Sequence, residues 1–423
     1  MRKTGKLKST PPVKPVQKVE VPVKITKWKV LLVAALLVVG VALIAYSVAQ
    51  MLTVPAGRQL IQAPDGLENT CIYDFQLWYH LGTTEEKTNK EKTAVTEVYV
   101  KAAGEAYGLF SDNEVAGYQN IYTINNNPGK TIEVKPALYE AFRLLQESGS
   151  RALYLGPAYE NNRALISSLS DDEANMHDPR TNAEVRRHYE ILTGFSASSD
   201  DVELELLGNN QVRLNISKEY KAFAEECAID RFISLDWMRN AFVTDYIADA
   251  LINAGYPNGT LESYDGFTRY MDVTTESHDF LVCDGSVNHQ VAKLRFADVK
   301  AVVWLRNYPI STAEKTDFYD WSDDRLTNSR LDPADGLDKA ACDDFVAYSC
   351  KYGCAGVLMQ TMDLYVADTL DWTQVQALPK ANVEYAIVWD QVLYVSGGSA
   401  SVMNADYQVV KGSVPAQNGG KEE

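Results

Sequence analysis

The sequence is poor in cysteine and histidine. Its 423 residues contain six cysteines and five histidines, a cysteine density far below that of disulfide-built secreted scaffolds. The histidines show no metal-ligand spacing. Cys350 and Cys354 lie one helical turn apart if that segment is helical, but no second Cys pair or His cluster lies near them in the sequence. We therefore expect mostly buried free thiols, although an even count also permits disulfides in an oxidising compartment.

The chain also lacks internal repeats, a Pro/Ser/Gly-rich dividing linker and the nucleophile-elbow motifs of hydrolases. Gly129-Lys130-Thr131 is similar to the end of a phosphate-binding loop. Position 124, however, is Ile where that loop needs its first glycine. This segment is predicted to be an ordinary Pro-Gly turn.

Beyond the N-terminus, acidic residues outnumber basic ones. Nine Lys/Arg and one Glu give residues 1–29 a charge of +8, so the rest of the chain carries −25 of the total of −17. A chain this acidic repels phosphate backbones, which argues against nucleic acid as a partner. A charge of this sign otherwise indicates a solvated surface.

An apolar run follows the basic segment. Residues 30–48 carry no charge, and 19 residues at a rise of about 1.5 Å span roughly 28 Å. The pattern predicts a single-pass signal anchor at 30–50, with the basic tail cytoplasmic and the bulk of the chain outside the cell membrane. A cleavable signal peptide is the rival, but its apolar core is usually about 7–15 residues. A buried core helix is a third interpretation of the apolar run, but the basic segment before the run argues against it.

The remaining chain has the composition of a globular protein. Hydrophobic residues make up 46% of the sequence, with seven Trp and 24 Tyr, enough to form a core. We expect a linker at 51–68, one mixed domain at 69–410 and a polar, disordered tail at 411–423.

Helical and strand patterns are both present, so the predicted fold class is α+β. Residues 137–146 and 242–254 place apolar residues three and four positions apart, which is typical of helices. Residues 300–305 are rich in β-branched and aromatic side chains, as strands are. Residues 385–396 are similar to a hairpin turning at Asp390-Gln391.

An ordered series of short segments resembles the FAD:protein FMN transferase family, the ApbE-like flavin transferases. Together the segments cover about residues 95–400. In chain order they are Leu155–Tyr159, Ile233–Asp245, Leu261–Arg269, Ile310–Thr312, Asn328–Gly336, Phe345–Thr361 and Tyr385–Ser396. Each is weak alone, since Asp-Pro-x-x-Gly is common in ordinary turns. Their order and spacing carry the resemblance.

The resemblance implies a two-subdomain mixed α/β domain outside the cytoplasm. It also implies FAD in a cleft, Mg²⁺ on the pyrophosphate, and transfer of FMN to a Thr or Ser of an exported protein with release of AMP. The resemblance assigns cofactor binding to these residues: Gly156, Asp236, Asp245, Gly266, Thr312, Asp332 and Gly336. Thr361 is carried over as a metal ligand.

The chain departs from the family where the chemistry lies. The family's Gly-Gly pair falls on Asp236-Trp237, and the following Ala-Lys falls on Arg239-Asn240. The metal-binding Asp falls on Val357, or on Gly356 in the neighbouring register, and neither residue can bind Mg²⁺. The family's His before Asp-Pro falls on Ser329.

Three functional hypotheses remain open from the sequence. In the first, the chain is a catalytically silent relative that acts as a binding or scaffold module for an exported or flavinylated envelope protein, through Trp237 and Tyr264, with no cofactor. In the second, it is a divergent transferase that uses FAD, with Asp236 or Asp363 holding Mg²⁺. In the third, it is an exported adhesin, although sortase and repeat signatures are absent.

Overall fold

In this computed structural model, residues 27–51, 54–67, 70–271, 278–413 and 415 are described. They form two separate compact units, with the boundary between Val54 and Pro55. Most of the predicted basic tail and most of the predicted C-terminal tail lie outside the described residues.

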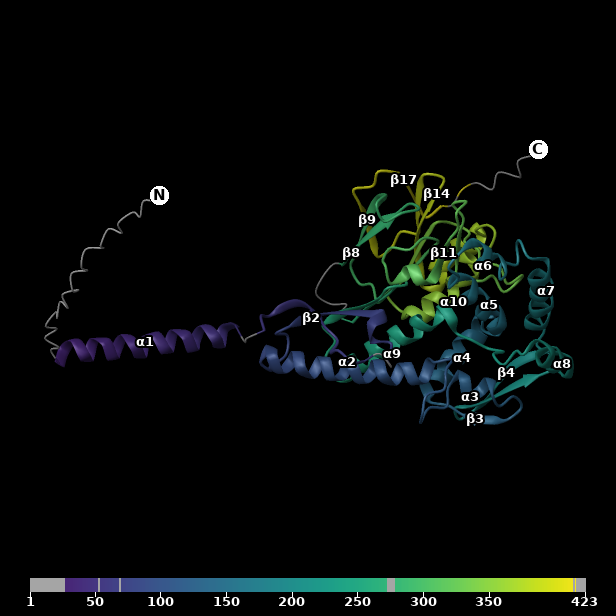
Figure 1. Cartoon of the computed structure of the whole chain (residues 1–423). Coiled ribbons are helices and arrows are strands. Elements are labelled where there is room, and N and C mark those ends of the chain that lie inside the picture. Colours follow the sequence, from purple (N-terminus) through teal and green to yellow (C-terminus); the bar gives the residue numbers. More distant parts are fainter. Residues whose placement is uncertain (1–26, 52–53, 68–69, 272–277, 414, 416–423) are drawn as a thin grey trace, which may run out of the picture. The chain divides into compact units, whose positions relative to one another are not determined.

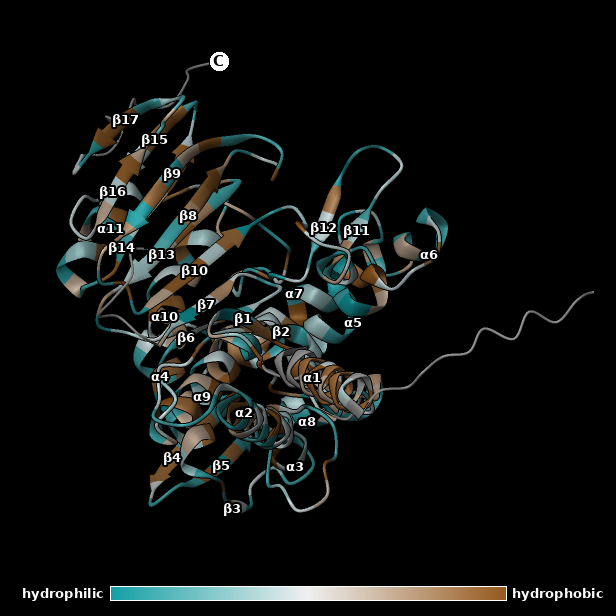
Figure 2. Ribbon diagram, turned by 90° about the vertical axis from the view of Figure 1, so that its left-hand side faces the viewer, coloured by the Kyte–Doolittle hydropathy of each residue, from teal (hydrophilic) through white to brown (hydrophobic). Residues whose placement is uncertain are grey.

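The first unit contains helix α1, Lys27–Met51. Many of its large apolar side chains are exposed (brown in Figure 2), among them Leu36, Val38 and Ile44. Among the residues that the structure describes, no helix is long and apolar enough to cross a membrane. The transmembrane helix expected at 30–50 is therefore unsupported by the structure.

The second unit is built on a nine-stranded sheet with the order β1-β2-β6-β7-β10-β13-β14-β15-β17. Neighbouring strands are antiparallel except β15 and β17. The strands are β1 Gly57–Ile61, β2 Phe75–Leu81, β6 Gly259–Ser263, β7 Phe267–Tyr270, β10 Ala301–Arg306, β13 Asp344–Ser349, β14 Glu384–Trp389, β15 Val392–Val395 and β17 Gln408–Lys411. Strand β1 forms within the segment 51–68 that was expected to be a linker, because it pairs along its length with β2.

Three smaller sheets complete the strands. They are β16-β9-β8, β3-β5-β4 and β11-β12. Their strands are β3 Thr131–Glu133, β4 Val202–Gly208, β5 Gln211–Ile216, β8 His278–Cys283, β9 Gln290–Phe296, β11 Phe318–Asp320, β12 Leu326–Asn328 and β16 Ala400–Met403.

Helices α2, α9 and α10 pack against the large sheet, and α4 joins them (Figure 1). Helix α9 buries Val243, Ile247 and Leu251, which recur at helical spacing. The helices of this unit are α2 Thr88–Phe110, α3 Ile121–Asn125, α4 Pro136–Ser148, α5 Gly156–Ile166, α6 Asp171–Asn175, α7 Ala183–Ala197, α8 Lys218–Cys227, α9 Arg239–Asn253, α10 Cys354–Tyr365 and α11 Trp372–Ala377.

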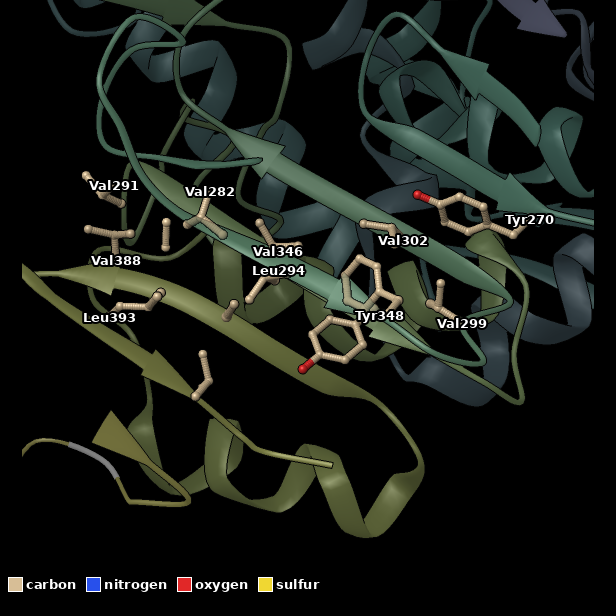
Figure 3. Packing of buried hydrophobic residues seen from close by; sticks show 14 residues of the cluster. Tyr270, Val282, Val291, Leu294, Val299, Val302, Val346, Tyr348, Val388 and Leu393 are labelled. Atoms are coloured by element: carbon tan, nitrogen blue, oxygen red, sulfur yellow. The ribbon is translucent and has the colours of Figure 1, made fainter. Parts of the chain in front are cut away.

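The small sheet β16-β9-β8 packs on the large sheet through an apolar cluster (Figure 3). Leu294 from β9 and Val282 from β8 pack with Val302, Val346 and Val388 from the large sheet. All six residues of β13 are buried, as expected for a strand covered on both faces. This two-sided burial fixes the register of the central strands.

The local predictions are confirmed. Helix α4 covers the first predicted helical segment, and α9 and β10 match the second helical segment and the predicted strand to within one residue. Asp390 and Gln391 have φ of 51° and 57°, the left-handed pair that a tight hairpin turn requires. Gly129, with φ of 80°, lies in a turn before β3 and not at the start of a helix. All six cysteines are free, and four of them are buried.

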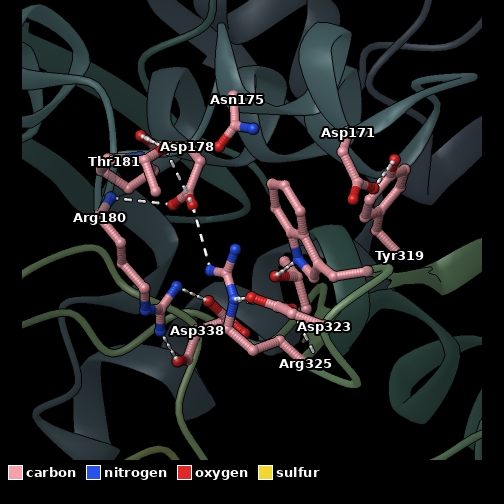
Figure 4. A network of polar contacts seen from close by, with 12 residues as sticks. Asp171, Asn175, Asp178, Arg180, Thr181, Tyr319, Asp323, Arg325 and Asp338 are labelled. Carbon is pink, nitrogen blue, oxygen red and sulfur yellow. Dashed lines mark hydrogen bonds and ion pairs between the residues drawn. The ribbon is translucent and has the colours of Figure 1, made fainter.

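A polar network attaches the segment around α6 to the β11–β12 hairpin (Figure 4). The buried Asp178 accepts from the backbone N–H of Arg180 at 2.9 Å and faces Arg325 Nη1 at 3.4 Å. Arg180 pairs with Asp338. Asp171 accepts from the Tyr319 hydroxyl at 2.9 Å. These contacts hold the α6 segment against the β11–β12 hairpin and the turn that contains Asp338.

A buried ion pair lies at the end of β10. Arg306 Nη2 is 2.7 Å from Glu314 Oε1, and both side chains are fully buried. The same Nη2 donates to the Tyr264 carbonyl at 2.9 Å, and Glu314 Oε2 accepts from Ile310 N–H at 2.8 Å. The pair thereby joins the β6–β7 turn to the loop at 310–317.

We predict that Glu314→Gln destabilises the protein by about 3–5 kcal/mol, because removing one partner of a buried pair leaves the other charge uncompensated. Denaturant unfolding of the full chain measures this change. Arg143→Ala is the control, since Arg143 pairs with Glu140 at the surface and exposed pairs contribute little. Equal unfolding midpoints for Glu314→Gln and the unmodified protein would contradict the prediction.

Candidate functional site

A polar cavity lies where five segments of the second unit meet. They are helix α5, the 3₁₀ turn Asp236–Met238 with the start of α9, the β6–β7 turn, the end of the 3₁₀ turn Glu314–Asp317, and residues 329–330. The volume open to the centre of a water molecule is about 20 Å³. Its lining residues are Arg163, Asp236, Trp237, Arg239, Asn240, Tyr264, Asp265, Phe267, Asp317, Ser329 and Arg330.

Asp236 occupies a backbone conformation that favours glycine. Its φ is +36°, in the region that residues with a Cβ adopt only at a cost. This is the position on which the family's glycine pair falls. Its carboxylate is almost fully buried and pairs with Arg163, Nε to Oδ2, at 2.6 Å, while the Arg163 side chain is 53% exposed. An internal ion pair therefore lies at the cavity, at the position on which the resemblance places a glycine.

Trp237 and Arg239 fill the adjoining space. Trp237 is buried and lines the cavity together with Tyr264, so both aromatic residues proposed from the sequence lie at the site. Arg239 faces Asp74 at 3.4 Å. Burial raises the pKa of Asp74, and the charge of Arg239 acts in the opposite direction. Asp74 therefore supplies a counter-charge for Arg239 from within the protein.

Asp265 lies in the β6–β7 turn and is held by Asn240, whose Nδ2 donates to Oδ2 at 3.0 Å. Burial raises its pKa to about 7; the Ser263 hydrogen bond and Arg330 lower it, while Asp317 raises it further. The next residue, Gly266, has φ of +108°, and a Cβ there would lie 2.3 Å from the Trp304 carbonyl oxygen. Gly266 is thus required for the close approach of this turn to β10.

Two other predicted site residues support packing. Asp245 accepts from the backbone N–H groups of Cys354 and Ala355, each at 2.9 Å, and so caps helix α10 from helix α9. Gly156 lies against the Arg231 carbonyl, which a Cβ would approach to 2.2 Å. The structure places neither residue among those lining the cavity.

The turn at Asp332 and Gly336 likewise lies outside the cavity lining. Asp332 accepts from Ala334 N–H and from Lys339 Nζ, each at 2.8 Å. Gly336 has φ of +75° and its N–H donates to the Asp332 carbonyl at 2.7 Å. Asp363 accepts from Ser150 at 2.7 Å and does not line the cavity either.

Thr312 and Thr361 are both apart from the cavity. Thr312 is exposed in the loop before Glu314. Thr361 is fully buried in α10, where its hydroxyl donates to the Val357 carbonyl at 3.0 Å. Val357 is also fully buried, so the predicted metal position is surrounded by packed side chains.

Sequence reasoning did not identify Arg163, Asp265, Asp317 and Arg330 as site residues. Asp265 lies inside the matched segment 261–269, so the resemblance contained a signal for it. Arg330 lies inside the matched segment 328–336, but the pattern there has an apolar residue. Arg163 and Asp317 belong to no pattern, and only the folded chain brings them to the cavity.

The comparisons with known proteins identify the fold. The flavin transferase ApbE from Vibrio cholerae matches with a TM-score of 0.52 at 13% identity, over 83% of this chain and 98% of that one. The ApbE protein from Thermotoga maritima matches with a TM-score of 0.54 at 12% identity, over 83% and 97%. This chain has the ApbE fold. No protein-family model and no curated protein matches the sequence.

FAD and Mg²⁺, which the ApbE fold implies, do not fit these residues. Sites for ligands of drug size have volumes of about 300–1,000 Å³, whereas this cavity admits little more than a water molecule. The Asp236–Arg163 pair and Trp237 line this cavity, at and beside the positions on which the resemblance places the family's glycines. Over the described part of the chain, no group of three or more His, Cys, Asp or Glu side chains could hold a metal ion.

We predict that Asp265→Asn changes how stability depends on pH. Because the folded-state pKa is raised to about 7 above the unfolded value near 4, the folded protein keeps a proton that the unfolded chain loses. Asp265 therefore lowers stability progressively as pH rises from about 4 to 7. The melting temperature of Asp265→Asn relative to the unmodified chain should be higher at pH 8 than at pH 5. A difference that does not vary with pH would contradict this.

Proposed function

We propose that this chain is a catalytically silent binding module built on the ApbE fold. The observation that carries the proposal is the closed cavity, in which the Arg163–Asp236 pair and Trp237 occupy the place of the family's glycines. A transferase site needs glycines that admit the phosphates and a carboxylate that holds the metal. Here the glycine positions carry side chains, and the metal position carries Val357 or, in the neighbouring register, Gly356.

The polar lining supports a binding role. Cavities built only to complete a core are apolar, whereas this one brings several charged side chains together beneath a half-exposed arginine. Buried charges are costly unless they are paired, and we propose that this site keeps its charged lining for recognition. An exported or flavinylated envelope protein remains the proposed partner of the module.

We predict that the purified full chain neither binds FAD nor releases AMP when Mg²⁺ and a Thr-containing acceptor are added. Quenching of flavin fluorescence measures binding, and chromatography measures AMP. Trp237→Gly should increase flavin binding, because it removes the largest side chain from the cavity. Trp389→Gly is the matched control, since Trp389 is 41% exposed and does not line the cavity. AMP release by the unmodified chain would establish the divergent transferase instead.

We also propose that the N-terminal unit attaches the chain to a membrane, with the second unit on the outer side. The proposal rests on the basic residues 1–29, the uncharged residues 30–48 and the exposed apolar side chains of α1. The full chain is expected in the membrane fraction after carbonate washing, and residues 55–423 in the supernatant. Recovery of the full chain in the supernatant would contradict the proposal.

A further inference from the structure

A groove lined by helices α4 and α9 lies apart from the polar cavity. About 420 Å³ of it are open to the centre of a water molecule, against about 20 Å³ in the polar cavity. This volume falls within the range of small-molecule sites, about 300–1,000 Å³. One wall is a face of α4 between Ala137 and Leu144, and the other is a face of α9 between Phe242 and Asn253. The groove and the polar cavity share no lining residue.

Small and aromatic side chains form the apolar part of the groove. Ala141 of α4 and Ala250 of α9 line it without any atom beyond Cβ, so the space between the helices stays open. Phe110 and Phe242 stack with ring centroids 6.2 Å apart, and Tyr246 meets the Phe110 ring in a T-shaped contact at 6.3 Å. These three aromatic residues line the groove as well. A ligand with an apolar body matches such a lining, and aromatic rings also attract cations.

In each wall of the groove, two carboxylates share one arginine. Arg269 lies 3.3 Å from Asp245 of α9 and 3.4 Å from Asp249, so one guanidinium serves both. On α4, Glu140 shares its single arginine partner with Glu147. Among the described residues that line the groove, none is Lys or Arg. Both walls therefore keep a negative charge, which attracts a cation and repels an anion.

We propose that this groove binds a small organic ammonium compound with an apolar body, of the arylalkylamine class. The body packs on the alanines and aromatic rings, and the ammonium pairs with Asp249, whose side chain is 61% exposed. The groove is separate from the polar cavity, so the proposal goes beyond the proposed function and does not depend on it.

Isothermal titration calorimetry of the full chain tests the proposal with 2-phenylethylamine, which is a cation at neutral pH. The matched probes are 2-phenylethanol, which is neutral, and 3-phenylpropionate, which is an anion. The amine should bind about fivefold more tightly than the alcohol and at least about tenfold more tightly than the carboxylate. Its binding should weaken as NaCl is added, because exposed charges are screened. Absence of amine binding at millimolar concentration overturns the proposal, and so does equal binding of the carboxylate.

Asp249→Asn tests the charge of the groove. It removes one carboxylate and should weaken binding of the amine about two- to fivefold. Asp323→Asn is the matched control, since Asp323 is 59% exposed, also pairs with an arginine and lies outside the groove. The control should bind the amine as the unmodified chain does. Equal weakening in both variants would contradict the assignment.

Ala250→Leu tests the location. The added side chain occupies the groove and should weaken binding of the amine at least about tenfold, while the helix is kept because leucine is nearly as good a helix former as alanine. Ala222→Leu, at an exposed position of α8 outside the groove, should have no effect. Unchanged binding by Ala250→Leu would refute the site. FAD binding by the unmodified chain would contradict the proposed function and leave this result unaffected.

Discussion

Arg306 is buried at the end of β10, with its guanidinium 2.7 Å from the equally buried Glu314. Burying two charges is costly unless their geometry and hydrogen bonds compensate, and here further hydrogen bonds to both side chains support the pair. The guanidinium also donates to the carbonyls of Tyr264 and Trp304 and stacks over the Trp304 ring at 4.3 Å. Arg330 Nη1 donates to the Arg306 carbonyl at 2.9 Å. One residue thus contacts three of the segments that line the cavity, two through its side chain and one through its backbone carbonyl.

The cavity closes because those segments are held in place. Gly266 lets the β6–β7 turn approach β10, which brings Asp265 opposite Asn240. Asp236, in a left-handed backbone conformation, directs its carboxylate to Arg163. An ApbE fold with glycine at this position would present backbone N–H groups to a ligand. This chain places the Asp236 carboxylate there, and its Oδ2 pairs with Arg163.

Much of the fold follows from local sequence. Helices α4 and α9, strand β10 and the hairpin at Asp390-Gln391 were predictable because their side-chain periodicity and turn residues favour one structure. The site was only partly predictable. Asp236, Trp237 and Tyr264 lie at the cavity as the motif order suggested, whereas Asp245 and Gly336 serve a helix cap and a turn. In a sequence motif, an acidic residue or a glycine that binds a ligand cannot be told from one that caps a helix or forms a turn.

The sequence by itself determined the charge division, the α+β class and the order of the ApbE-like segments, and it predicts that other residues stand where the family has its glycines and metal-binding Asp. These are properties of composition, period and spacing. Only the tertiary structure decided what replaced the lost groups. Arg163 lies 73 positions before Asp236, and Asp317 and Arg330 come from segments farther along the chain. Contacts at such separations are set by how packed elements bring loops together, which no local pattern records.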